Sequence, residues 1–391
     1  MANLNRKLPF TLRNQCKFMA GGLIRRLTKR FFIVLNCIVC VCFLLACLVP
    51  YLNPATWWPI GFLGLMFPYL TILLIFFMLF WLITKPRLSI LPLITLLIGL
   101  KQLSTLFATH FKSNFTNVKI EPRLRIADWN VGSLVGLSKG KDKQKAIRKQ
   151  IASALVNLDP DVICLQEFNH SYTQGKQADN IGLLLKEYPH YFFSEDYQKG
   201  KGFFLYGSII FSKYPIIHTG KIQYPGQRVE SLIYADIVKG PDTVRLFTTH
   251  LQSFRFSPSD YQDIERIQQQ DKELFDASKN IFKKMKVAFT RRGVQANIVR
   301  ENLDESPYPS IICGDFNDVP NSYTYFQIRG NWQDAFLEKD FGIGRTYIAL
   351  APTLRIDYII PDQNFEIHQF DMIDEDLSDH LLLVADVSLK K

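Results

Sequence analysis

The chain has 391 residues and a net charge of +10, so one or two globular domains are expected. Residues 1–120 contain 13 Lys and Arg and no Asp or Glu, whereas residues 121–391 contain 33 Lys and Arg against 36 Asp and Glu. The two parts therefore carry +13 and −3. Because the larger part is slightly acidic, the basic total is no argument for nucleic-acid binding.

The N-terminal part contains three apolar runs. Phe31 to Tyr51 and Trp57 to Ile83 are uncharged, and each exceeds the roughly 20 residues that cross the hydrocarbon core of a bilayer. Leu88 to Ala108 is a third candidate, interrupted by Lys101, whose amine can reach the membrane surface from near a helix end. We expect a membrane anchor of two to three transmembrane helices over residues 31–110.

Basic residues beside these runs predict the orientation. A cleaved signal peptide is an alternative interpretation of the first run, but a long basic region precedes it and more membrane-length sequence follows, which favours a signal anchor. Residues 1–30 are therefore expected to form a basic cytoplasmic tail, with Lys85 and Arg87 also inside. Three spans would place the C-terminal domain outside, in the periplasm or extracellular space. If residues 88–108 only lie on the surface, that domain is cytoplasmic.

The cysteines say little about the compartment. Cys37 and Cys40 have a spacing seen in metal sites, but neither a second pair nor a His accompanies them, so small apolar residues in lipid are the favoured interpretation. Cys164 and Cys313 lie in short apolar runs and are predicted to be buried free thiols. No disulfide framework is indicated.

Residues 121–391 suit one α/β domain. Lys141 to Leu158 is predicted to be a helix that ends at Asp159-Pro160. Residues 260–302 are polar with helical spacing and contain a basic cluster, made of Lys283, Lys284, Lys286, Arg291 and Arg292. Strands are predicted in apolar runs at 161–166, 207–212, 230–238, 243–249, 309–313, 354–360 and 381–388.

Several apolar, strand-like runs have polar residues at one end. Five apolar runs end in residues able to bind metal or phosphate, at Asp128-Trp129-Asn130, Gln166-Glu167, Thr249-His250, Gly314-Asp315-Phe316-Asn317 and Asp357, and Ser378-Asp379-His380 opens a strand. Antiparallel neighbours bring the end of one strand beside the start of another, so the polar residues are expected to converge at one edge of the sheet core. Alone, each has another interpretation: a solvated charge for Glu167, or a core histidine for His250.

The ordered set resembles the endonuclease/exonuclease/phosphatase superfamily, the DNase I-like proteins. The resemblance covers about residues 122–391 and includes Gly207 to Ser212, which is similar to a central core strand of that family. It implies a four-layer α/β/β/α sandwich of two packed mixed sheets covered by helices. The sequence departs from some members at Gly132, where they carry an acid, so this loop supplies no carboxylate for a second metal.

The resemblance also implies a cofactor, Mg²⁺ or Mn²⁺. A phosphoester resists attack because its anionic oxygens repel nucleophiles, and a hard cation offsets that charge. Glu167 would be the main metal ligand, since Mg²⁺ prefers one or two carboxylates and retained waters. Asn130 and Asp379 would help to arrange the metal.

Five further residues receive catalytic roles from the resemblance. Asp315 would orient and deprotonate the attacking water, and Asn317 would donate to a phosphoryl oxygen. His380, held by Asp357, would donate to another phosphoryl oxygen as an imidazolium. His250 would be a second donor or the general acid for the leaving group.

The substrate stays open, because nucleases, lipid phosphodiesterases and phosphatases share this set. The anchor and the slightly acidic domain favour a lipid-like or small phosphodiester, with membrane lipid as the other partner, over nucleic acid. A surface-tethered endonuclease acting on DNA or RNA is the alternative. An inactive membrane-tethered binding module is disfavoured by the intact residue set, and a transporter by the absence of carboxylates from the apolar runs.

Overall fold

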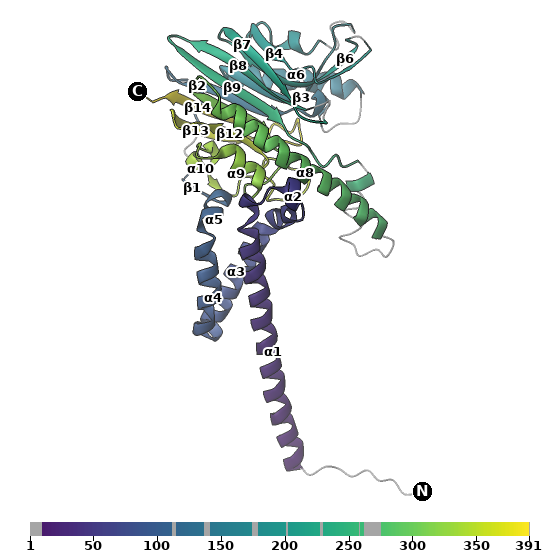
Figure 1. The fold of residues 1–391 in the computed structure, drawn as a ribbon, viewed down its shortest axis with the longest axis vertical. Coiled ribbons are helices and arrows are strands. Elements are labelled where there is room, and N and C mark those ends of the chain that lie inside the picture. The colour runs from purple at the N-terminus through teal and green to yellow at the C-terminus, as the bar shows by residue number, and fades with distance from the viewer. Residues whose placement is uncertain are drawn as a thin grey trace. The chain divides into compact units, whose positions relative to one another are not determined.

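The protein is described from a computed structural model. It describes residues 10–111, 115–136, 141–173, 179–200, 202–226, 230–257, 259–261 and 275–390, and their side chains except those of 10–23, 141–145 and 275–277. The chain forms two compact units (Figure 1). One comprises the chain to Cys47 with Met66–Leu100, and the other comprises Leu48–Leu65 with Lys101–Lys391.

The first unit is helical. Its elements are α1 (Phe10–Ala46), most of α3 (Ile60–Thr84) and α4 (Pro86–Ile98). The stretches Ile24–Tyr51 and Ile60–Thr84 are long and apolar enough to cross a membrane, which confirms the two strongest predicted spans in length and composition. The third candidate is a pair of helices, α4 and α5 (Leu100–Leu106), bent by 69° at the break between them.

Two packed sheets form the second unit. The seven-stranded sheet has the order β13-β14-β2-β3-β6-β4, with β5 beside β6; its strands are β2 (Leu124–Asn130), β3 (Val162–His170), β4 (His190–Phe193), β5 (Tyr197–Lys199), β6 (Phe204–Ser212), β13 (Phe365–Ile373) and β14 (Leu382–Leu389). The five-stranded sheet has the order β12-β10-β9-β8-β7; its strands are β7 (Ile216–Gln223), β8 (Ser231–Lys239), β9 (Asp242–His250), β10 (Ser310–Asp315) and β12 (Asp357–Pro361). The two-residue strands β1 (Ala108–Thr109) and β11 (Phe341–Gly342) pair separately.

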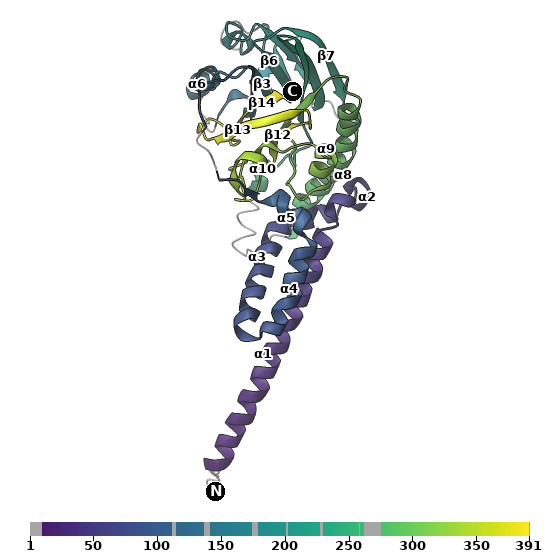
Figure 2. The same cartoon turned by 90° about the vertical axis from the view of Figure 1, so that its left-hand side faces the viewer.

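Helices cover both outer faces of this pair of sheets (Figure 2). The helix α6 (Lys141–Leu158) packs on the seven-stranded sheet, with Ile151 and Leu155 in one apolar cluster with strand residues. The helices α8 (Phe275–Asp304) and α9 (Tyr323–Arg329) cover the five-stranded sheet. A third cluster fills the space between the sheets. The predicted four-layer α/β/β/α sandwich is confirmed.

The predicted elements agree with most of this architecture. Helix α6 has the predicted bounds, and the predicted strands occur except that the one expected at 354–360 begins at Asp357. The strands β4, β5, β7 and β13 were not predicted. Strand β7 is an edge strand with mainly half-buried and exposed residues, and β13 has a register shift between Ile367 and Gln369 that breaks its alternation.

The chain between the first two apolar runs packs with the sandwich. Asn53 caps the short helix α2 (Pro54–Trp57) through its side-chain oxygen and donates from Nδ2 to the carbonyl of Gly293, 3.3 Å away. A Cβ at Gly293 would lie 2.2 Å from Asn53 Oδ1, so this close approach requires glycine. The two compact units are therefore not consecutive in the sequence, because Leu48–Leu65 belongs to the second unit and lies between two stretches of the first.

Candidate active site

Six segments bring their polar residues to one edge of the two sheets. Strands β2 and β3 are parallel, as are β9 and β10, so their carboxyl ends lie together. Strand β12 runs antiparallel to β10, and its first residue, Asp357, pairs with Asp315. A cavity of about 420 Å³ lies at this edge, and its polar lining includes the predicted residues Glu167, Asp315, Asn317, Asp379 and His380, together with Ser253, Arg255, Tyr261, Tyr347 and Ser378.

Glu167 is held in an unusual backbone conformation. Its φ is 52°, and the pairing of β3 with β6 shifts register between Leu165 and Phe168. A positive φ is uncommon for a residue with a Cβ, and such strain occurs mainly where surrounding structure over-determines it. The bulge turns the carboxylate into the cavity, where it interacts with the buried hydroxyl of Tyr206, whose pKa is raised by burial and by Glu167.

Asn130 connects two carboxylates at the end of β2. Its Nδ2 donates to Asp315 Oδ2 at 3.0 Å and lies 3.4 Å from Glu167 Oε1. Its Oδ1 accepts from the backbone N–H of Gly132 at 3.1 Å. The amide is therefore fixed at both ends, between the predicted metal-binding acid and the predicted base.

His250 faces the same two acids from the end of β9. Its Nε2 lies 3.8 Å from Glu167 Oε1 and 3.7 Å from Asp315 Oδ2. Among the described residues this buried nitrogen has no hydrogen-bond partner. A buried polar atom without a partner is costly, so its position at a reactive edge indicates a ligand or water contact.

Asp315 ends β10 and is almost completely buried. Burial, reinforced by the charge of Asp357, raises the pKa of this carboxyl to about 6. Its Oδ1 accepts from the backbone N–H of Asn317 at 2.8 Å. Asn317, with φ 52°, donates from Nδ2 to the carbonyl of Leu251 at 3.0 Å, which leaves its second N–H for another acceptor.

Asp357 and His380 form a buried pair. Nδ1 of His380 lies 3.0 Å from each carboxylate oxygen of Asp357. Burial alone lowers the pKa of His380, but the charges of Asp357 and Asp315 outweigh it and raise that pKa to about 10. His380 is therefore an imidazolium at neutral pH, with Nε2 3.8 Å from Asp315 Oδ2.

Asp379 completes the acidic side of the cavity. Burial raises the pKa of this carboxyl, and the nearby charge of Glu167 adds to the increase. The preceding residue, Ser378, donates from its hydroxyl to the Asn130 carbonyl at 2.7 Å and so ties this loop to β2.

Two tyrosines at the site were not predicted. The ring of Tyr347 lies 4.8 Å from that of His380, and its backbone forms an isolated β-bridge with the same residue. The hydroxyl of Tyr261 lies 2.9 Å from that of Tyr347, and both side chains line the cavity. Neither follows a strand-like run, so the strand-end pattern that identified the acids gave no signal for them.

The residues fit a divalent cation. Glu167 and Asp379 line the cavity, and Asn130 and the orphaned Nε2 of His250 lie within hydrogen-bonding or ionic range of Glu167. The carboxylates of Glu167 and Asp379 are oxygen donors of the kind that suits Mg²⁺, whereas Asn130 and His250 turn nitrogen atoms towards Glu167. A second grouping, Asp315 with Asp357 and His380, has ligand atoms within 4.8 Å of one another. Two of its members already bond to each other, so the Glu167 side offers the freer oxygens.

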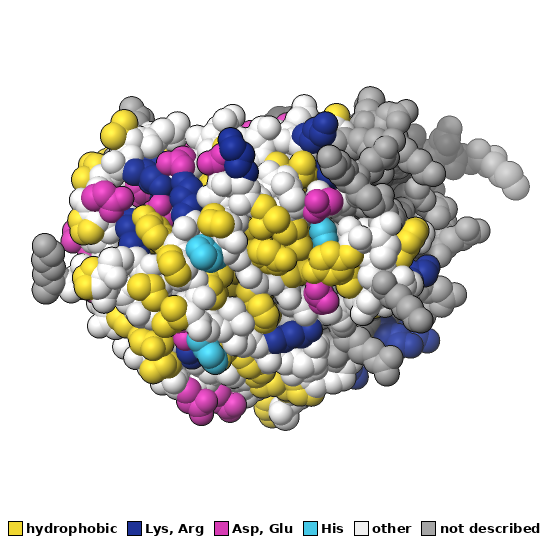
Figure 3. All heavy atoms as spheres, turned by 90° about the horizontal axis from the view of Figure 1, so that it is seen from above, with side chains coloured by type: hydrophobic (Ala, Val, Ile, Leu, Met, Phe, Trp, Pro, Cys, Tyr) yellow, Lys and Arg dark blue, Asp and Glu magenta, His cyan; other side chains and the backbone are white. Residues whose placement is uncertain are grey.

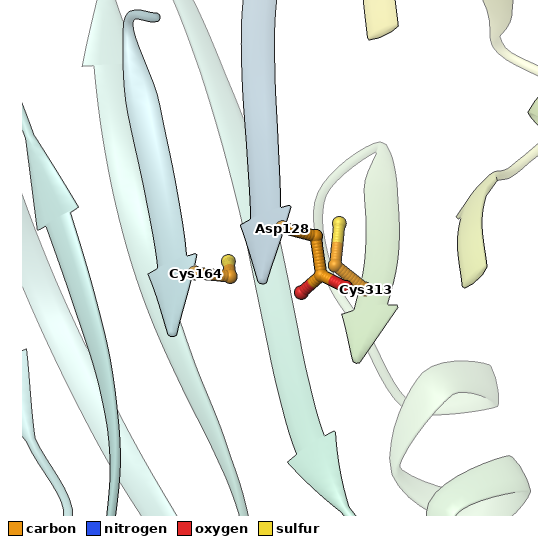
Figure 4. Close-up of side chains that lie close together, drawn as sticks. All are labelled: Asp128, Cys164 and Cys313. Atoms are coloured by element: carbon orange, nitrogen blue, oxygen red, sulfur yellow. The ribbon is translucent and has the colours of Figure 1, made fainter. Parts of the chain in front are cut away.

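Another acidic cluster lies in the core between the sheets. Figure 4 shows Asp128 with Cys164 and Cys313, whose ligand atoms lie within 4.8 Å of one another. All three are fully buried, and burial raises the pKa of Asp128 well above its usual range. Both thiols are free, as predicted. None of the three lines the cavity, and Gln166 donates from Nε2 to Asp128 Oδ1 at 2.7 Å.

The chain is similar to several proteins of known structure. Similar solved structures include an endonuclease/exonuclease/phosphatase from Beutenbergia cavernae, with 21% identity, coverage of 68% of this chain and 72% of that chain, and a TM-score of 0.47. They also include the human Nocturnin catalytic domain with bound sulfate anion, with 17% identity, coverage of 69% of this chain and 94% of that chain, and a TM-score of 0.48. A third is an endonuclease/exonuclease/phosphatase from Bacteroides vulgatus, with 17% identity, coverage of 69% of this chain and 100% of that chain, and a TM-score of 0.48.

No curated protein sequence matches the chain. Residues 29–106 match a domain of unknown function, DUF8431. Residues 129–380 match the Endonuclease/Exonuclease/phosphatase family, and this range contains the ordered polar residues from Asn130 to His380. That match covers more than half of the chain, and the chain belongs to this family of phosphoester hydrolases.

Proposed function

We propose that the protein is a membrane-anchored, divalent-metal-dependent phosphodiesterase. The observation that carries the proposal is the meeting of Glu167, Asp315 and Asn130 beside the His380–Asp357 pair in one cavity. A cation held by Glu167, Asn130 and Asp379 would offset negative charge on the phosphoryl oxygens. An inactive binding module would not need a buried acid, an imidazolium and an orphaned histidine nitrogen at the same place.

The chain's own residues suit hydrolysis. Asp315 has a pKa of about 6, near the value at which a general base both exists as a carboxylate and accepts a proton effectively at neutral pH. His380 is positioned by Asp357 to donate from Nε2 to a phosphoryl oxygen, and the second N–H of Asn317 is a further donor. His250 Nε2 is available for the leaving group.

The segments that make up the second compact unit support a location of the active site outside the cytoplasm. Leu48–Leu65 contains the chain between the first two candidate spans, Lys101–Lys391 contains the chain after the third candidate, and both belong to this unit. Lys101 donates to the Tyr51 hydroxyl at 3.3 Å, and the rings of Phe62 and Phe289 lie 5.2 Å apart.

Segments that pack together lie on the same side of a membrane, so the chain between them crosses an even number of times. Helix α3 crosses once, and residues 86–106 must then cross back, despite their bend. With the basic tail in the cytoplasm, the active site is periplasmic or extracellular.

Surface charge favours a small or lipid-like phosphodiester over nucleic acid. Three residues of the predicted basic cluster are engaged within the fold: Arg292 is buried against Asp318, Arg291 donates to Gln252, and Lys284 pairs with Asp260. Figure 3 shows one face of the molecule on which Lys and Arg are interspersed with Asp and Glu. Nonspecific DNA binding requires several accessible cations along a phosphate backbone.

The test uses the full chain purified in detergent with bis(p-nitrophenyl) phosphate. Activity should disappear in chelator and return with Mg²⁺ or Mn²⁺, and Glu167→Gln should raise the metal concentration needed for half-maximal rate. Glu366→Gln, on the exposed side of β13, is the matched control. Full activity in chelator would overturn the metal mechanism. Efficient, salt-sensitive nicking of plasmid DNA would instead indicate a surface endonuclease.

A further inference from the structure

We propose that the first turns of α3, at the start of the second candidate span, build an apolar subsite in the active-site cavity, and that this subsite holds the hydrocarbon chain of a lipid phosphoester. The inference rests on the proposed function and specifies its substrate class. Leu65, the last residue of α3 that belongs to the second compact unit, lines the same cavity as Glu167, Asp315 and His380. The other apolar lining includes Phe254, Phe256, Leu350 and Leu354.

Close backbone packing holds Leu65 in the cavity wall. A Cβ at the neighbouring Gly64 would lie 2.7 Å from the carbonyl oxygen of Asn321 and 3.4 Å from Val49. The helix therefore approaches the loop after β10 as closely as its backbone allows. That loop also carries Asn317 and Val319, which line the cavity. The apolar wall and a predicted phosphate-binding residue are thus parts of one packed arrangement.

A row of aromatic rings joins the cavity rim to the start of α3. Phe256 stacks on Phe254 at 5.2 Å, and Phe254 meets Phe289 of α8 edge-on at 5.6 Å. Phe289 in turn meets Phe62 of α3 at 5.2 Å. A Cβ at Gly61 would lie 2.7 Å from the Phe289 ring, so the fit is close. The start of α3 consequently supports the rim through Phe62 as well as lining the cavity through Leu65.

Leu65 lies near the start of α3, the helix that forms the second candidate span. Helix α3 continues without interruption from Leu65 to Thr84. Nineteen residues of helix are about 28 Å long, close to the roughly 30 Å hydrocarbon core. If α3 is the second span, Leu65 lies near the boundary between hydrocarbon and water.

The cavity combines the chemistry of both ends of an amphiphile. The acidic residues of the cavity can hold a cation, and His380 and Asn317 can donate to a phosphoryl group. The side chains of Leu65, Phe254 and Phe256 offer only apolar contact. A substrate made of phosphate and a small polar group would leave that wall exposed to water. A hydrocarbon chain covers it, and each buried CH₂ group adds to binding.

The experiment compares p-nitrophenyl alkyl phosphodiesters with methyl, octyl and hexadecyl chains, using the full chain in nanodiscs with Mg²⁺. The octyl-to-methyl ratio of kcat/KM should be at least about tenfold, since two well-buried CH₂ groups suffice for that factor. Leu65→Ser should reduce the ratio by about threefold or more, and Leu65→Trp should reduce it by filling the subsite. Met66→Ser changes the next residue, which does not line the cavity, and should keep the wild-type ratio.

The outcomes separate the two proposals. If no ester is hydrolysed in the presence of metal, the proposed function fails. If the methyl ester is hydrolysed but the rate is independent of chain length, or if Leu65→Ser and Met66→Ser give the same ratio, only the apolar subsite is wrong. Turnover of the methyl ester by each variant shows that its site has folded.

Discussion

His380 Nδ1 lies equally close, at 3.0 Å, to both carboxylate oxygens of Asp357. The two residues are 23 positions apart in the chain, and Asp357 is the first residue of β12 whereas His380 precedes β14. The contact orients the imidazole so that Nε2 faces Asp315. A buried Asp partner both fixes the tautomer and stabilises the imidazolium.

This pair should act as a unit. Asp357→Asn and His380→Ala should each lower kcat by about 10²–10⁴, the usual scale for a positioned donor. The double variant should be little slower than the slower single variant, because removal of one partner already removes the function of the other. Additive losses would mean that the residues work independently. His368→Ala, on β13 away from the cavity, is a suitable control.

Tyr347 is predicted to position His380 through its ring. Tyr347→Ala should lower kcat by about two- to tenfold, the range expected for loss of one aromatic contact. Tyr347→Phe keeps the ring and loses only the hydroxyl contact with Tyr261, so it should retain most of the activity. Equal losses in both variants would show that the hydroxyl, and not the ring, matters.

The orientation can be tested with single cysteines and a membrane-impermeant maleimide on intact cells. Thr56→Cys in the interspan segment and Lys186→Cys in the catalytic unit should both be labelled from outside. Arg87→Cys should be labelled only after permeabilisation. Labelling of Thr56→Cys but not of Lys186→Cys would mean that residues 86–106 do not cross the membrane. It would also contradict the assignment of Thr56 and Lys186 to one compact unit.

The contact between α2 and α8 should tolerate no side chain at Gly293. Gly293→Ala places a methyl group against Asn53 and the N–H of Ala55. Overpacking of about 1–3 kcal/mol should exceed the gain of about 1 kcal/mol that alanine brings to a helix. The variant should therefore unfold at a lower temperature in detergent than wild type. Val294→Ala, at an exposed neighbouring position, should not.

The lowered pKa of Asp260 predicts that part of the free energy of unfolding depends on pH. Burial raises its pKa, but hydrogen bonds from Lys284 and Ser257 outweigh that effect and lower it to about 2. A carboxyl whose folded pKa is below its unfolded value of about 3.9 stabilises the fold above that unfolded value. Its contribution is lost as the pH falls from about 4 towards 2. The difference in unfolding midpoint between wild type and Asp260→Asn should thus be constant near pH 6 and shrink below pH 4.

Much of the site could be predicted from local sequence. Each acid or histidine follows or precedes a short apolar run, and the alternation of strands and helices orders those runs in a sandwich. The order of the polar residues along the chain therefore indicated both fold and family. Asp357 shows the limit of this reasoning: it was expected to end a strand-like run, but it begins β12, and antiparallel pairing with β10 brings it beside Asp315 anyway.

The sequence by itself determined the apolar spans, the strand-end chemistry and the family. Only the tertiary structure decided that Leu48–Leu65 belongs with the catalytic unit, that Leu65 lines the cavity, and that Arg292 is buried against Asp318. Contacts such as Gly64 to Asn321 join segments more than 250 residues apart. Hydrophobic periodicity reports which face of an element is buried, but not which distant element buries it, because close packing depends on the shapes of both partners.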